Sequence, residues 1–289
     1  MVDVVIVGAG PAGLSAAVYT ARAGFSTMVI GGVPGGLLTT TEQVDNYLGL
    51  PGTSGADMAE LFVNHAKQFG AEMVYENISK IVKNDHGFTV EIEDGSSVPA
   101  RSVIFAAGSD PRKLGVKNEH VSGVSYCATC DGMFFEGDDV AVIGGGETAV
   151  EDSLYLSQIA ASVHVFVRSQ WRATAPAVAK LEAKDNVTIH LGENVAEIVE
   201  DSGSVSGVVT SDGGTLRVDG VFVAAGQCPN SKTAEGFVTL YEDGFIEQST
   251  VDGFFVAGDI RNSEYRQVAV AVGDGATAGI AATRYLLNK

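Results

Sequence analysis

The stretch VVIVGAGPAG, residues 4–13, decides the fold of this chain. Its first four residues are apolar, as expected of a parallel strand that is buried on both faces. The glycines follow at the spacing G-x-G-x-x-G, and a helix over 14–23 and a second strand over 26–30 are expected next. In this order Gly8 makes the tight turn, Gly10 lets the backbone approach a pyrophosphate, and Gly13 allows close helix–strand packing. The stretch therefore predicts a dinucleotide site at the helix N-terminus.

A second copy of this unit begins near residue 138. An expected strand over 138–143 leads into residues 144–149 (GGGETA), which have the form G-x-G-x-x-A. A helix over 149–159 and a strand over 163–167 should follow. The two halves also end alike, with VIFAAG at 103–108 and GVFVAAG at 220–226. A repeat of this kind predicts two nucleotide sites and an α/β fold with two Rossmann-like domains.

Two of the three cysteines, Cys127 and Cys130, lie between the two glycine turns. A C-x-x-C pair can close a disulfide ring and exchange two electrons, but it is also half of a zinc site, and zinc usually takes four nitrogen or sulfur ligands. The remaining cysteine and the histidines are not spaced along the chain as zinc ligands usually are. They are Cys228, His65, His86, His120, His164 and His190. The flanking nucleotide units favour a redox pair, with a zinc site as the alternative.

Charged residues follow two of the expected strands. Arg168 and Arg172 lie where an NAD site would carry an acidic residue, and a guanidinium pairs well with the 2′-phosphate of NADP. The alternative is a solvated basic turn. In the C-terminal segment, Asp259 ends an apolar strand at 254–259, where ligands bind in this fold class. Its alternative role is to cap the next helix, expected over 270–287.

Length and charge exclude several classes of protein. A chain of 289 residues suggests about two domains. The net charge of −18 argues against binding to nucleic acid or to anionic membranes. Residues 1–3 lead directly into a strand, without a signal peptide or a membrane-spanning run, so we expect a cytoplasmic protein. In a reducing compartment, three cysteines fit a catalytic pair better than a structural disulfide.

Together these features resemble the low-molecular-weight thioredoxin reductases, the bacterial flavoprotein form, over essentially the whole chain. The most specific elements are residues 127–131 (CATCD), the second glycine turn, and Gly258-Asp259 with 266–268 (RQV). The resemblance implies that NADPH reduces thioredoxin, or a thioredoxin-like protein, through FAD and a Cys127–Cys130 disulfide. It also implies a homodimer. Each chain would hold two Rossmann-like three-layer ββα domains, an FAD domain at 1–113 and 236–289 and an NADPH domain at 114–235 inserted into it.

The resemblance also assigns site residues. The catalytic residues would be Cys127, Cys130 and Asp131. FAD would be bound by Gly8, Gly10, Pro11, Ala12, Gly13, Gly35, Gly36, Leu37, Asn46, Ala107, Gly108, Gly258, Asp259, Arg266, Gln267 and Val268. NADPH would be bound by Gly144, Gly146, Glu147, Thr148, Arg168 and Arg172.

Roles within the redox pair follow from charge and from the resemblance. Because a carboxylate would repel a neighbouring thiolate, we expect Asp131 to act as a proton donor and acceptor with a raised pKa. Its alternative role is that of a turn or cap residue. The resemblance implies that Cys130 faces the flavin. It further implies that the inserted domain rotates about hinges near Lys113 and Gly236.

Three departures from the family pattern keep alternatives open. Phe166 and Val167 replace the first two residues of a His-Arg-Arg-x-x-x-Arg motif, so NADH remains a possible donor. Leu37 replaces a glutamine beside the flavin, and residues 46–49 (NYLG) replace Asn-x-Pro-Gly. The alternative function is a related flavin disulfide reductase that uses NADH, reduced ferredoxin or reduced flavin, or that serves another thioredoxin-like protein or a peroxidase. A rival from another class is a non-catalytic nucleotide- or zinc-binding regulator.

Overall fold

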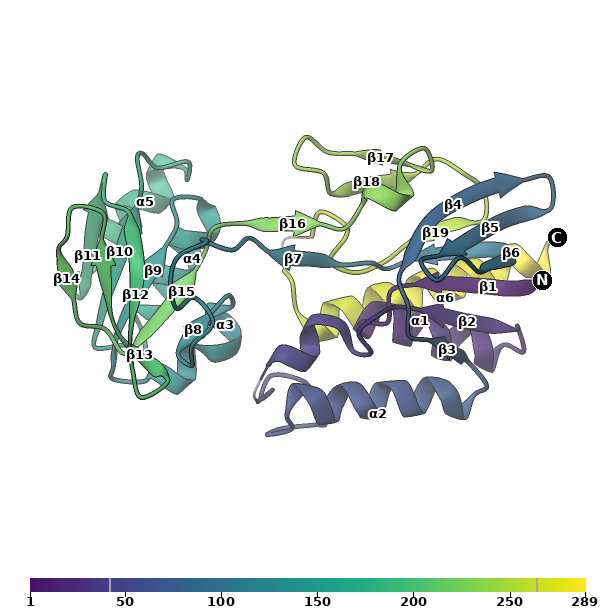
Figure 1. Cartoon of the computed structure of the whole chain (residues 1–289), viewed down its shortest axis with the longest axis horizontal. Coiled ribbons are helices and arrows are strands. Elements are labelled where there is room, and N and C mark those ends of the chain that lie inside the picture. The colour runs from purple at the N-terminus through teal and green to yellow at the C-terminus, as the bar shows by residue number, and fades with distance from the viewer. Residues whose placement is uncertain (42, 264) are drawn as a thin grey trace. The chain divides into compact units, whose positions relative to one another are not determined.

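The computed structural model describes residues 1–41, 43–263 and 265–289. They form two compact units: unit 1 is Met1–Asp110 with Cys228–Lys289, and unit 2 is Pro111–Gln227 (Figure 1). The first part of unit 1 ends three residues before the boundary expected at 113, and its second part begins eight residues before the boundary expected at 236. Residues 228–235 lie in unit 1, where the Asn230 side chain donates to Ala107 O and Asp110 Oδ2, each at 3.1 Å.

Unit 1 contains one mixed sheet with strand order β3-β2-β1-β6-β5-β4, and β19 pairs with β6. Strands β3, β2, β1, β6 and β19 run parallel, whereas β4 and β5 form an antiparallel hairpin beside β6. The strands are β1 (Val2–Val7), β2 (Thr27–Ile30), β3 (Glu72–Val74), β4 (Ile78–Asn84), β5 (Gly87–Ile92), β6 (Ser97–Phe105) and β19 (Phe254–Val256).

Helices and smaller elements complete unit 1. Helices α1 and α6 pack closely because Gly275 and Gly279 of α6 lie against the backbone of Ala12 and Ala16, where a Cβ would not fit. The helices are α1 (Pro11–Arg22), α2 (Gly55–Gln68) and α6 (Val268–Leu287), with 3-10 turns η1 (Gly36–Thr40) and η3 (Lys232–Ala234). A hairpin is formed by β17 (Val238–Leu240) and β18 (Ile246–Ser249), and β7 (Ser109–Pro111) pairs with β16 (Gln227–Pro229) where the chain passes between units.

Each face of the unit 1 sheet has its own apolar core. One core joins the sheet to the helices through small and branched residues such as Ile6, Ala16 and Ile104. The other is rich in aromatic rings, with Phe88, Phe105 and Phe254 in contact. The β1 side chains from residue 4 to residue 7 alternate between these two cores, which explains why all four are apolar.

Unit 2 repeats the plan with a five-stranded parallel sheet of order β11-β10-β9-β15-β8. A second, three-stranded antiparallel sheet has the order β12-β13-β14. The strands are β8 (Val124–Ser125), β9 (Asp139–Ile143), β10 (Ser162–Val167), β11 (Val187–Leu191), β12 (Val195–Asp201), β13 (Ser204–Thr210), β14 (Thr215–Leu216) and β15 (Gly220–Val223). The helices are α3 (Ala128–Asp131), α4 (Glu147–Leu156) and α5 (Ala175–Glu182), with the 3-10 turn η2 (Gly132–Phe135).

The α/β class and the repeated strand–turn–helix–strand unit are confirmed. The helix expected over 270–287 begins at Val268, and the strand expected over 163–167 begins at Ser162. Separate apolar cores lie on the two faces of the unit 2 sheet, one against helices α4 and α5 and one against the antiparallel sheet. Among the described helices, none has the length and apolarity needed to cross a membrane.

Candidate active site

The first glycine turn lies between β1 and α1. Gly8 has φ +106° and its N–H donates to Ile30 O at 2.8 Å, while an added Cβ would collide with the Ala106 carbonyl. Gly10 caps α1 without a side-chain hydrogen bond, and no atom lies within 4 Å of the place where its Cβ would be. There is therefore open space beside Gly10 at the N-terminus of this helix, and such a helix end suits a phosphate group.

Two buried polar atoms of unit 1 have no hydrogen-bond partner among the described residues: Asp259 Oδ1 and Arg266 Nε. Burial raises the pKa of Asp259, and the nearby charge of Arg266 offsets only part of that effect. The Arg266 guanidinium also lies 4.7 Å from the centre of the Phe245 ring. Since buried polar groups normally have partners, this acceptor and this donor fit a polar ligand between the end of β19 and the start of α6.

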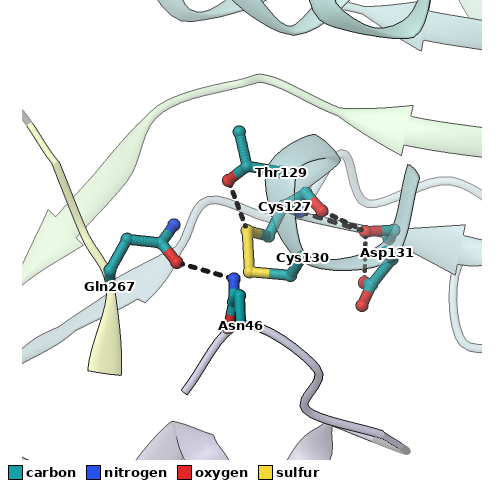
Figure 2. Close-up of a disulfide and its surroundings, with 7 residues drawn as sticks. Asn46, Cys127, Thr129, Cys130, Asp131 and Gln267 are labelled. Carbon is teal, nitrogen blue, oxygen red and sulfur yellow. Dashed lines mark hydrogen bonds between the residues drawn. A yellow bond between two sulfur atoms is a disulfide. The ribbon is translucent and has the colours of Figure 1, made fainter. Parts of the chain in front are cut away.

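Other predicted FAD residues surround the same end of the unit 1 sheet. The Asn46 amide donates to Gln267 Oε1 at 3.1 Å, which joins the loop after β2 to the start of α6 (Figure 2). Gly35 donates its N–H to Ala9 O at 2.8 Å, and Gly36 approaches Gly10 so closely that a Cβ would lie 3.2 Å from the Gly10 Cα. The remaining predicted residues are Pro11, Ala12 and Gly13 in α1, Leu37 in η1, Ala107 and Gly108 after β6, Gly258 after β19, and Val268 at the start of α6.

The second glycine turn lies between β9 and α4 and repeats the geometry of the first. An added Cβ on Gly144 would collide with the Ala224 carbonyl, whereas Gly146 caps α4 and has open space around it. Glu147 and Thr148 begin the helix. Gly144 thus corresponds in position to Gly8. The carbonyl groups that exclude a Cβ at these two glycines belong to the two similar apolar segments, 103–108 and 220–226.

The loop after β10 is tied to this second turn by three hydrogen bonds. The N–H groups of Arg172 and Ala173 donate to Gly145 O at 2.7 and 3.3 Å, and the Thr174 N–H donates to Glu147 Oε1 at 2.6 Å. Arg168 and Arg172 are exposed, and neither forms an ion pair with a described residue. In an acidic protein, two guanidinium groups without a protein anion suit an anionic ligand.

The redox pair lies in unit 2, at the end of β8. Cys127 and Cys130 form a disulfide with Cα atoms 5.3 Å apart, around the short helix α3 (Figure 2). The Cys127 carbonyl accepts from the N–H groups of Cys130 at 3.2 Å and Asp131 at 3.1 Å. Thr129 Oγ1 lies 3.5 Å from Cys127 Sγ. The ring is therefore fixed by its own backbone, with a hydroxyl beside one sulfur.

Ser125 is a site residue that the sequence analysis missed. Its hydroxyl donates to Asp131 Oδ2 at 2.6 Å and accepts from the Cys127 N–H at 3.0 Å. The side chain of Asp131 is therefore held toward the segment that carries Cys127. A hydroxyl residue two positions before a C-x-x-C pair was the available signal, but its direction depends on β8 pairing with β15.

Glu119 anchors the residue that precedes the redox pair. It accepts from the Leu114 N–H at 2.6 Å, from the Gly115 N–H at 2.8 Å and from the Tyr126 hydroxyl at 2.8 Å. Burial alone would raise the pKa of Glu119, but these hydrogen bonds lower it overall. Burial and the neighbouring Glu119 raise the pKa of Tyr126. Lys113 Nζ lies 3.2 Å from the Tyr126 hydroxyl, so the start of unit 2 and the redox segment share one polar cluster.

Two exposed apolar side chains follow the redox helix. Met133 is 58% exposed and Phe134 is 50% exposed, both in η2. The third cysteine, Cys228, is a free and exposed thiol in β16. Large exposed apolar side chains such as Met133 and Phe134, which follow the Cys127–Cys130 segment in the chain, are typical of a protein-docking surface.

Residues 2–275 match the pyridine nucleotide-disulphide oxidoreductase family. With two dinucleotide-type turns and a C-x-x-C disulfide in place, the chain belongs to that family.

Within it, the chain is similar to thioredoxin reductases. It is 39% identical over 300 residues to thioredoxin reductase of Bacillus subtilis (strain 168), covering 98% of this chain and 94% of that protein. The crystal structure of thioredoxin reductase from Streptococcus pyogenes MGAS5005 is 36% identical, with a TM-score of 0.93, and the match covers 100% of this chain and 99% of that one. A relative with another activity, glucosaminate ammonia-lyase of Pseudomonas fluorescens, is 38% identical over 305 residues, covering 98% of this chain and 95% of that protein.

Proposed function

We propose that this protein is a thioredoxin-disulfide reductase that uses NADPH and FAD. The observation that carries the proposal is the Cys127–Cys130 disulfide in the second of two dinucleotide-binding units. Similarity to the Bacillus subtilis thioredoxin reductase over 98% of the chain supports the same activity. When bound, FAD supplies the flavin through which two electrons reach the disulfide from the pyridine nucleotide.

The residues of unit 1 fit FAD. The open helix end at Gly10 suits the pyrophosphate, and the partnerless atoms of Asp259 and Arg266 suit the polar chain of a flavin cofactor. Asn46 and Gln267, joined by a hydrogen bond, would lie near the flavin ring. These contacts hold and orient the cofactor.

The residues of unit 2 fit NADPH. The N-terminus of α4 at Gly146 suits the pyrophosphate, and Arg168 and Arg172 suit the 2′-phosphate. Glu147 positions the arginine loop through its hydrogen bond to the Thr174 N–H. NADH would lack the group that the arginines recognise, so we propose NADPH as the preferred donor.

The reduced pair would pass its electrons on by thiol–disulfide exchange. The thiolate of one cysteine attacks one sulfur of the thioredoxin disulfide, and the other thioredoxin sulfur leaves as a thiolate. The second cysteine then attacks the mixed disulfide, which restores the Cys127–Cys130 bond and leaves thioredoxin as a dithiol. Two electrons and two protons move in total. Asp131, oriented by Ser125, would accept and return a proton at the adjacent cysteine sulfur.

Met133 and Phe134 would form the contact surface for thioredoxin. They directly follow α3, so a partner that reaches the redox pair meets these two exposed side chains. The protein would act in the cytoplasm as a homodimer, without a nucleic-acid or membrane partner.

A coupled assay tests this function. The purified protein should be yellow, and it should oxidise NADPH continuously when thioredoxin from the same organism and a disulfide dye are present. Matched reactions replace NADPH by NADH, or thioredoxin by a thioredoxin-like protein, a peroxidase or glucosaminate. Turnover that requires thioredoxin supports the proposal. Ammonia release from glucosaminate without thioredoxin reduction, or turnover with only another electron carrier, would contradict it.

A further inference from the structure

The two sulfur atoms of the redox disulfide have different surroundings. Thr129 Oγ1 lies 3.5 Å from Cys127 Sγ, and Figure 2 shows the hydroxyl directed at that sulfur. Within unit 2, whose residues are all described, no hydroxyl group forms a hydrogen bond with Cys130 Sγ. The proton transfer proposed above uses Asp131 and leaves Thr129 without a role. The two sulfurs are therefore chemically distinct before any partner binds.

The direction of the contact follows from the chemistry of a disulfide. A disulfide sulfur carries no hydrogen atom, so the Thr129 hydroxyl is the donor and Cys127 Sγ is the acceptor. Both residues belong to the ring that the disulfide closes around α3. Cys127 is half-buried and Thr129 is exposed. The donor thus reaches the sulfur without help from another element of the fold.

Reduction of the pair creates a charge that this donor can stabilise. Two electrons from NADPH break the bond between the sulfurs, and uptake of one proton leaves one thiol and one thiolate. A thiolate is a better hydrogen-bond acceptor than a neutral sulfur, because hydrogen bonds to ionised groups are stronger. A donor that already lies beside Cys127 therefore favours the thiolate at that sulfur.

The charged groups around the pair favour the same distribution of charge. Asp131 directly follows Cys130, and a carboxylate there disfavours a neighbouring thiolate. The other charged side chains near this segment of unit 2 form no hydrogen bond with either sulfur: they are Glu119 and Lys113, which contact the Tyr126 hydroxyl, and Asp152 in α4, which packs against Gly132. Thr129 is thus the side chain of unit 2 that distinguishes Cys127 from Cys130.

We propose that Thr129 is a catalytic residue that stabilises negative charge on Cys127 Sγ, so that the reduced pair consists of a Cys127 thiolate and a Cys130 thiol. The inference rests on the function proposed above. A sulfur that carries charge easily is also the better leaving group in disulfide chemistry. When the disulfide opens by attack at Cys130 Sγ, Cys127 Sγ leaves with the bonding electron pair, and the Thr129 hydroxyl donates to it.

Alkylation by iodoacetamide as a function of pH tests the role of Thr129, because the thiolate is the reactive form. The FAD-loaded variant with Cys130→Ser and Cys228→Ser retains Cys127 as its single thiol. Adding Thr129→Val removes the hydroxyl and keeps the shape of the side chain. We expect the midpoint of the Cys127 titration to rise by roughly half a pH unit to one unit, which is about a threefold to tenfold lower thiolate fraction near neutral pH.

Two matched arms separate this role from a structural one. Thr129→Ser keeps the hydroxyl and should restore the Cys127 midpoint. In the variant with Cys127→Ser and Cys228→Ser, Cys130 is the single thiol, and Thr129→Val should leave its midpoint unchanged. Retained flavin absorbance should show that each variant is folded.

A Cys127 midpoint that does not rise in Thr129→Val, or an equal shift at Cys127 and Cys130, would overturn the proposal. The titration requires neither NADPH nor thioredoxin. Its failure would therefore count against the role of Thr129 alone, whereas the coupled assay tests the proposed function.

Discussion

The Ser125 hydroxyl donates to Asp131 Oδ2 at 2.6 Å and so helps to place this carboxyl group. Proton transfer by a positioned side chain typically contributes 10²–10⁴-fold to a rate. We therefore expect Asp131→Asn to slow reduction of thioredoxin by roughly 10²–10⁴-fold in single-turnover experiments with pre-reduced enzyme. Flavin reduction by NADPH should stay at the parent rate, because Asp131 has no role in that step.

Ser125→Ala separates orientation from proton transfer. It leaves the carboxyl group of Asp131 in place but removes its hydrogen-bond donor. Loss of a hydrogen bond to a charged group costs about 1.5–3 kcal/mol, so we expect a smaller slowing, of roughly tenfold or more. Unchanged thioredoxin reduction in both variants would show that Asp131 is only a turn residue.

Asp152 in α4 gives the protein a pH-dependent weakness. Burial, with a further contribution from Glu151, raises its pKa from 3.8 to about 7. The folded state therefore prefers the protonated form, and its stability falls as the pH rises from about 4 to about 7. The difference between the folded and unfolded pKa of Asp152 lowers the free energy of unfolding by at most about 4 kcal/mol above pH 7.

Asp152→Asn removes a charge that the folded protein disfavours. We expect the variant to melt several degrees higher than the parent at pH 8 and at nearly the same temperature at about pH 3, since below the unfolded pKa both side chains are neutral. Thermal unfolding of the FAD-loaded proteins at both pH values measures this. An equal difference at the two pH values would rule out ionisation of Asp152 as the cause.

At the scale of elements, the loop after β10 should decide between NADPH and NADH. Arg168→Gln and Arg172→Gln each remove one charge-assisted hydrogen bond to the 2′-phosphate, a loss of about 1.5–3 kcal/mol. We expect the KM for NADPH to rise roughly 10–100-fold in each variant, with the KM for NADH unchanged.

Glu147→Gln is the matched test of loop positioning. Its side-chain oxygen can still accept from the Thr174 N–H, whereas Glu147→Ala cannot. The alanine variant should therefore raise the KM for NADPH and the glutamine variant should largely restore it. If the KM for NADH rises equally in the arginine variants, the loop acts on the shared part of the nucleotides.

Some features of these elements could be predicted from the sequence and others could not. The glycine turns could be predicted because each depends on a few consecutive residues, and Gly8 and Gly144 indeed face backbone that excludes a Cβ. The contacts that orient the site residues could not be predicted from the sequence. Ser125 with Asp131, and Glu147 with Thr174, meet only after strands pair or loops fold back, and no sequence periodicity encodes those directions. The predicted boundaries of β10 and α6 lie within two residues of the observed ones, because apolar patterns mark the ends of these elements well.

At the scale of the whole molecule, the two units should be separable. Each has its own apolar cores, and β7 and β16 pair where the chain passes between them. A variant that joins Asp110 to Cys228 through a short glycine–serine linker should fold, because those strand ends lie close together. We expect it to bind FAD and to lack thioredoxin reduction.

Flavin absorbance after gel filtration checks this variant. A folded protein without FAD would contradict the assignment of FAD to unit 1. The complementary fragment, residues 111–227, is the matched control, and it should bind NADPH without flavin.

Counting thioredoxin thiols under anaerobic conditions tests the central claim most directly. With limiting NADPH, the FAD-loaded protein should form two thioredoxin thiols for each NADPH consumed, because each hydride carries two electrons. Cys228→Ser should match the parent. Cys127→Ser and Cys130→Ser should form none, although NADPH still bleaches their flavin absorbance. Thioredoxin thiols produced at the parent ratio by either single-cysteine variant would contradict the account.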